Sequence, residues 1–65
     1  MNKIVYLDGR LADSMGRMEI ILLANRLAEL TRQPVDILTH GKSKYHGEHR
    51  YTGVPPIEEV KLKNV

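Results

Sequence analysis

The chain is 65 residues long, carries a formal net charge of +2, and is 42% hydrophobic and 28% charged. These values are typical of one small globular domain, and they exclude a multi-domain enzyme and an intrinsically disordered chain. The absence of cysteine excludes disulfides and thiolate metal sites. With no Phe and no Trp, the core must be aliphatic. A single core of this size supplies only about 3–5 kcal/mol, so we expect partners to add stability.

The apolar runs are too short for targeting or for membrane insertion. The first ends at Asp8, and the longest covers only residues 20–24. A secretory signal needs about 7–15 apolar residues in its centre, and a membrane span needs roughly 20. We therefore expect a cytoplasmic protein with no membrane partner.

Residues 2–7 predict the first strand. Ile4, Val5 and Tyr6 favour extended structure, and the turn residues Asp8 and Gly9 end it. The apolar run is continuous, which is typical of a strand that is buried on both faces. We expect residues 8–13 to form a connecting loop.

Residues 14–33 predict a helix. Asp13 or Ser14 can accept a hydrogen bond from the free N–H groups of the first turn, and Pro34 ends the helix. Seven apolar residues fill about half of the helical wheel and predict the side that faces the core. These residues are Ile20, Ile21, Leu23, Ala24, Leu27, Ala28 and Leu30.

Three further apolar residues, Met15, Met18 and Leu22, lie on or close to the polar side of the same helix. We call them the helix patch. Single exposed apolar residues are normal on protein surfaces, which is one interpretation. The other is a second buried face, which one small sheet cannot cover, so another subunit or another protein would contact it.

Residues 35–39 predict a second strand, and residues 57–64 predict a C-terminal edge strand with alternating charges. Strand, helix and strand in this order form a β-α-β unit with parallel strands and a right-handed crossover. Residues 40–52 between the later strands form a basic loop or hairpin. The predicted fold class is therefore α/β or α+β, with residues 1–65 as a single domain and one central helix on a small sheet.

The basic segment, residues 40–51, carries the entire excess of positive charge. Lys42, Lys44 and Arg50 face only Glu48 there, and the charges on either side of the segment cancel. The segment also holds all three histidines and two of the three tyrosines. It has almost no aliphatic residue, so we expect it to stay outside the core. It is either a solvated loop or a recognition surface.

The order of the elements predicts where a ligand would bind. In parallel sheets, ligands bind beyond the carboxyl ends of the strands, which here carry residues 8–10 and 40–42. Cationic side chains and loop glycines at this edge favour an anion, and tyrosines can stack on a base. The predicted ligand-binding residues are Arg10, His40, Gly41, Lys42, Lys44, Tyr45, His46, His49, Arg50 and Tyr51.

Three chemistries are not expected. The stretch from Gly41 to Ser43 resembles the end of a phosphate-binding P-loop, but Asp36 stands where that loop needs its first glycine. The three histidines lie among cationic residues that would repel a metal ion, so we expect no metal and no cofactor. No spacing of nucleophile and base indicates catalysis, so we do not expect an enzyme.

The sequence therefore predicts a small, non-enzymatic, homo-oligomeric binding protein. It would bind or sequester a phosphate-bearing small molecule such as a nucleotide through the basic segment and the strand ends. One alternative is a protein–protein inhibitor or adaptor that uses the helix patch. The other is an RNA- or DNA-binding module, which the small net charge makes less favourable.

Overall fold

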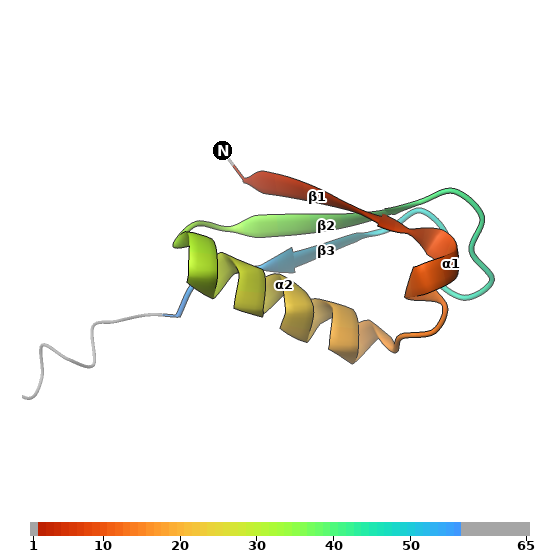
Figure 1. Cartoon of the computed structure of the whole chain (residues 1–65), viewed down its shortest axis with the longest axis horizontal. Coiled ribbons are helices and arrows are strands. Elements are labelled where there is room, and N and C mark those ends of the chain that lie inside the picture. Colours follow the sequence, from red (N-terminus) through yellow and green to blue (C-terminus); the bar gives the residue numbers. More distant parts are fainter. Residues whose placement is uncertain (1, 57–65) are drawn as a thin grey trace, which may run out of the picture.

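The computed structural model describes residues 2–56 and shows one layer of helix on one face of a small mixed sheet (Figure 1). In the sheet order β1-β2-β3, β1 and β2 are parallel, whereas β2 and β3 are antiparallel. The predicted α/β class with its β-α-β unit is confirmed. The elements are β1 (Lys3–Asp8), α1 (Gly9–Ala12), α2 (Arg17–Thr31), β2 (Val35–His40) and β3 (Arg50–Gly53).

One face of the sheet packs against α2, and we call the opposite face the open face. On β1, Ile4 and Tyr6 belong to the open face and are 49% and 67% exposed. The prediction that this strand is buried on both faces is therefore wrong. The physical reason is that the described elements form only one helical layer, so nothing in residues 2–56 covers the second face.

The core lies between α2 and the strands β2 and β3. Its fully buried large side chains are Ile20, Ile37 and Val35. Of the predicted core side of the helix, Ile20, Ala24 and Ala28 are buried, and Ile21 and Leu27 are partly buried. Leu23 and Leu30 are exposed, which corrects that prediction. The helix α2 packs over β3 and β2, and these two leucines lie on the part of its surface that this packing leaves exposed.

The loop predicted at residues 8–13 contains a short helix, which corrects that prediction, and the helix predicted at residues 14–33 begins only at Arg17 and ends at Thr31. Residues 9–12 form α1, where the Asp8 side chain accepts a hydrogen bond from the backbone N–H of Arg10 at 2.8 Å. The helix α2 begins after Gly16, whose N–H donates to Glu19 Oε1 at 2.9 Å. Gly16 lowers the local helix propensity and so favours the break at this point. At the other end, Arg32 adopts a left-handed conformation with φ 59° before Pro34.

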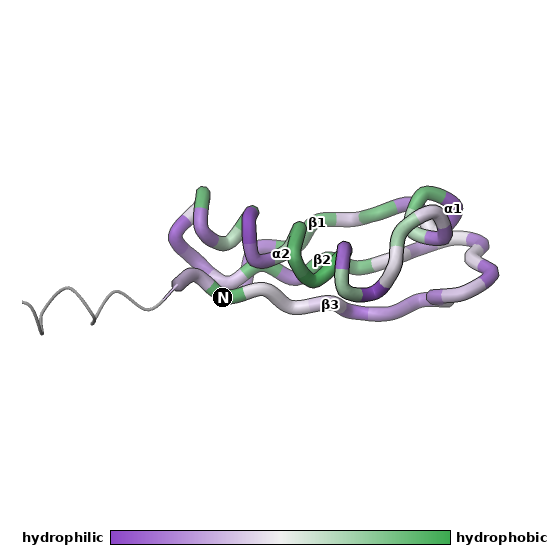
Figure 2. Tube along the Cα trace, turned by 90° about the horizontal axis from the view of Figure 1, so that it is seen from below, coloured by the Kyte–Doolittle hydropathy of each residue, from purple (hydrophilic) through white to green (hydrophobic). Residues whose placement is uncertain are grey.

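The strand predicted at residues 35–39 is present as β2 and extends to His40. The loop that follows it, between β2 and β3, is mostly polar (Figure 2). The basic loop or hairpin predicted at residues 40–52 contains β3 at its C-terminal end. The strand predicted at residues 57–64 lies outside the described residues. Neither helix in residues 2–56 is long and apolar enough to cross a membrane.

A close contact between backbones holds α2 on the sheet. A Cβ atom added at Gly53 would overlap the backbone of Ala24 and the backbone nitrogen of Asn25. Ala24 is itself fully buried. Only a residue without a side chain lets the helix approach β3 this closely.

We predict that Gly53→Ala lowers the free energy of unfolding by about 1–3 kcal/mol, because the added methyl group overpacks this contact. Urea unfolding followed by circular dichroism measures the change. Gly16→Ala is the control, since its Cβ would lie 3.6 Å from Glu19 Oε1, an ordinary contact. The control should cost less than about 1 kcal/mol, the scale of a helix-cap change. Equal losses for the two variants would contradict the packing argument.

Candidate functional site

The carboxyl ends of the two parallel strands lie next to each other. Asp8 is opposite His40 in the register, and Gly9 follows Asp8 into α1. A Cβ atom at Gly9 would lie 2.7 Å from the Lys42 carbonyl oxygen and 3.0 Å from that of His40. The chain after β1 therefore packs directly on the loop after β2, with no space between them for a ligand.

The Asp13 side chain occupies the hydrogen-bond donors of this loop. It accepts from Ser43 Oγ at 2.6 Å, from the Lys44 N–H at 2.6 Å and from the Tyr45 N–H at 3.0 Å. The Ser43 hydroxyl and, less strongly, the two N–H groups lower the pKa of Asp13 from 3.8 to about 2, against the opposing effect of desolvation. These three donors are therefore used by the protein's own carboxylate and do not serve a phosphate.

His46 and Tyr51 join the basic segment to the core. His46 Nε2 lies 2.9 Å from the carbonyl oxygen of Met15, and Nδ1 lies 2.7 Å from the Tyr51 hydroxyl. Because a carbonyl only accepts, Nε2 carries a proton; in the neutral ring, Nδ1 then accepts from Tyr51. Tyr51 is only 5% exposed and belongs to the core cluster. The expectation that the basic segment stays outside the core is therefore wrong at Tyr51, whose ring is not at the surface.

A groove of about 310 Å³ lies on the open face near the ends of β1 and β2. Tyr6, Leu38 and Arg50 are register partners, so they form one row across the three strands. The rings of His40 and Tyr6 meet edge to face with their centroids 5.9 Å apart. The residues that line this open-face groove are Tyr6, Leu38, Thr39, His40, Glu48, His49 and Arg50.

Asp36 lies on the open face beside this row. It is buried and accepts from Thr52 Oγ1 at 2.7 Å and from Asn2 Nδ2 at 3.3 Å. The Thr52 hydroxyl is the main cause that lowers the pKa of Asp36, with smaller contributions from Asn2 and from the charge of Arg50. Arg50 Nη1 is 3.9 Å from Asp36 Oδ2, at the outer limit of an ion pair. Asp36 therefore anchors β3 and offsets part of the Arg50 charge.

The predicted ligand-binding residues separate into groups. His40, His49 and Arg50 line the open-face groove. His46 is partly buried in internal contacts and Tyr51 is in the core. The others are exposed and are not among the residues that line the groove; they are Arg10, Gly41, Lys42, Lys44 and Tyr45.

Sequence reasoning missed Tyr6 and Leu38 as residues of the candidate site. Each looked like one more member of an apolar strand. The signal that finds them is the two-residue alternation of strands together with the register, which aligns both with Arg50. The alignment with Arg50 depends on β3, a strand of four residues. The sequence pattern does not distinguish this short strand from the basic loop before it.

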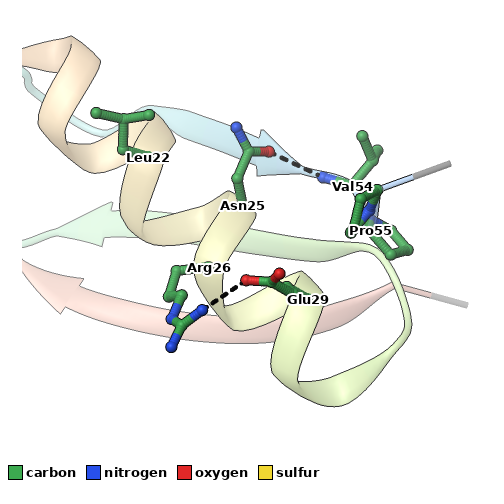
Figure 3. Close-up of a pocket in the computed structure, with 7 residues that line it drawn as sticks. Leu22, Asn25, Arg26, Glu29, Val54 and Pro55 are labelled. Atoms are coloured by element: carbon green, nitrogen blue, oxygen red, sulfur yellow. Dashed lines mark hydrogen bonds and ion pairs between the residues drawn. The ribbon is translucent and has the colours of Figure 1, made fainter. Parts of the chain in front are cut away.

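The helix patch is only partly at the surface. Met18 and Leu22 are 65% and 58% exposed, whereas Met15 is partly buried against the core. Leu22 also lines a second groove of about 530 Å³ between α2 and residues 54–56. There, Asn25 Oδ1 accepts from the Val54 N–H at 3.1 Å, and Arg26 pairs with Glu29 at 2.7 Å (Figure 3).

No group of three His, Asp or Glu side chains within residues 2–56 is placed to hold a metal ion. The expectation that no metal is needed stays a prediction. Comparison with protein-family models, with curated proteins and with solved structures finds no match to this chain.

We predict that Asp13→Asn destabilises the protein at neutral pH, because the Asn amide group would replace an oxygen that accepts hydrogen bonds. The lowered pKa adds stability that is fully present above the ordinary value of 3.8 and is lost as the pH falls toward about 2. The difference between wild type and variant should therefore shrink across that window. Urea unfolding midpoints at a series of pH values measure this effect.

Glu48→Gln is the control for Asp13→Asn, since it neutralises an exposed carboxylate in the same loop. It should change the unfolding midpoint less than Asp13→Asn does. A variant at position 13 that is as stable as wild type near neutral pH would show that the three hydrogen bonds do not hold the loop.

Proposed function

We propose that this chain is a small, non-enzymatic, homo-oligomeric binding protein that takes a phosphate-bearing small molecule such as a nucleotide. The observation that carries this proposal is the row of Tyr6, Leu38 and Arg50 on the open face, with His40 beside it. The row joins an aromatic ring, an apolar side chain and a guanidinium in one groove. A cytoplasmic location belongs to the same proposal.

Each part of the groove has a partner in a nucleotide. The Arg50 guanidinium presents several N–H donors in a plane, which suits a phosphate. The exposed Tyr6 ring and Leu38 offer an aromatic and an apolar surface for a base. His40 and His49 add hydrogen-bonding groups at the rim. Glu48 and Asp36 offset part of the positive charge of the groove. The groove therefore suits a ligand with one phosphate group near Arg50 better than a polyanion.

We propose the open-face groove as the binding place, rather than the basic segment as a whole. The basic segment and the strand ends are the predicted binding place, but Asp13 already accepts from the Ser43 hydroxyl and from the N–H groups of residues 44 and 45 in that segment. Lys42 and Lys44 are exposed beyond the groove, and a longer nucleic acid is the ligand that would need them. The nucleic-acid and adaptor alternatives remain as outcomes of the test below.

We predict saturable binding of a mononucleotide such as AMP in isothermal titration calorimetry. Arg50→Ala should weaken this binding roughly ten- to a hundredfold, which corresponds to the loss of one charge-assisted hydrogen bond. Lys44→Ala is the matched control, because it removes an equal charge from the same segment outside the groove. It should leave the affinity nearly unchanged.

Two results would overturn the proposal. One is that no mononucleotide binds, whatever oligonucleotides or proteins do. The other is that Lys44→Ala weakens the binding as much as Arg50→Ala does. A steep dependence on salt together with a need for oligomers would favour the nucleic-acid alternative.

A further inference from the structure

The outer edge of β1 presents backbone hydrogen-bonding groups. The Lys3 N–H donates to the Pro34 carbonyl oxygen at 3.0 Å, toward β2. In a parallel ladder, the hydrogen-bonding groups of successive residues point to opposite sides of the strand. The N–H and C=O groups of Ile4 and Tyr6 therefore point away from β2. No strand within residues 2–56 pairs with this edge.

The side chains along this edge suit a further strand. Ile4 and Tyr6 are large and exposed, and residues of these types favour sheets. Edge strands that avoid association carry lysine, proline or a bulge at their centre. In β1 the charged residues, Lys3 and Asp8, stand only at the two ends. The centre of the strand therefore has none of these protective features.

We propose that a second copy of this chain pairs with β1 in antiparallel orientation, about a two-fold axis that passes through Val5. Ile4 then lies opposite the partner's Tyr6, and the two exchange both hydrogen bonds. On the open face, an axis through Tyr6 would instead place Ile4 opposite the partner's Asp8, and an axis through Ile4 would place Tyr6 opposite the partner's Asn2. Of these arrangements, only the axis through Val5 gives both Ile4 and Tyr6 an apolar partner on the open face, while Lys3 lies opposite the partner's Leu7 on the other face. This pairing of Ile4 and Tyr6 around Val5 is what favours a second copy of the chain, in this register.

This arrangement is compatible with the rest of the fold. A two-fold axis perpendicular to the sheet keeps the open faces of both copies on the same side. Because α2 packs over β3 and β2, it leaves the β1 edge accessible. The seam would cover Ile4 and Tyr6 in each copy and place the partner's Ile4 beside the Tyr6 that lines the groove. The inference rests on the homo-oligomer in the proposed function and is independent of the ligand.

The first experiment is the single substitution Val5→Cys followed by mild oxidation. Val5 would face the partner's Val5 as a non-hydrogen-bonded pair, with Cα atoms about 4.5 Å apart. This separation is inside the range of about 4.4–6.8 Å that a disulfide needs. The native chain has no cysteine, so any disulfide-linked dimer reports this contact. We expect such a dimer on a non-reducing gel, and no such dimer from Met18→Cys, which lies on the exposed helix patch.

The second experiment compares Ile4→Lys with Leu22→Lys in analytical ultracentrifugation at high micromolar concentration. Both residues are exposed, so each lysine should leave the fold intact. We expect a wild-type dimer that Ile4→Lys dissociates and Leu22→Lys does not. A monomeric wild type would overturn the proposal. Dissociation by Leu22→Lys alone, with linkage through Met18→Cys, would overturn it in favour of the helix patch.

Calorimetry of the Ile4→Lys variant separates this proposal from the proposed function, since Ile4 does not line the groove. A monomeric variant that still binds AMP supports the seam and leaves the binding proposal standing. A wild type that dimerises through β1 but binds no mononucleotide would support the seam and refute the binding proposal.

Discussion

The arrangement of the whole fold depends on the close contact between α2 and β3. Gly53 has no side chain, and Ala24 and Ala28 have small ones, so the helix lies directly on the strand. A helix fixed over β3 and β2 leaves Leu23 and Leu30 exposed, while Val5 and Leu7 of β1 still pack against the core. The edge at β1 has a separate cause, since the sheet order β1-β2-β3 of the described strands pairs it only with β2. The position of α2 therefore depends on one glycine and two alanines, and the free edge depends on the strand order.

The loop between β2 and β3 depends on two contacts with the chain that precedes α2. Asp13 accepts three hydrogen bonds from residues 43–45, and His46 lies between Met15 and Tyr51. These contacts hold the middle of the loop, residues 43–46, against the chain before α2. The strand β3 then begins at Arg50, whose side chain lies on the open face. A carboxylate that occupies a possible anion site thus supports a different candidate site several residues away.

Periodicity and turn residues predict the strands at residues 2–7 and 35–39 and most of α2, because these are local properties of the chain. The start of α2 after Gly16 has a local signal, because glycine lowers helix propensity, but the long apolar pattern around it predicts a helix from residue 14. The burial of Tyr51 and the exposure of Leu30 depend instead on where α2 lies across the sheet, which no local pattern encodes. For the candidate site, the sequence supplied His40, His49 and Arg50 by composition, whereas Tyr6 and Leu38 required the register.

The groove and the β1 edge share one residue of the open face, Tyr6. The buried core within residues 2–56 consists of seven hydrophobic residues and gives little stability, yet Ile4 and Tyr6 stay in contact with water. Covering such side chains is favourable, by about 25 cal/mol for each Å² of apolar surface removed from water. A partner strand would cover them along the edge, and a ligand would cover the opposite side of the Tyr6 ring. Tyr6 is therefore the residue at which assembly and binding would influence each other.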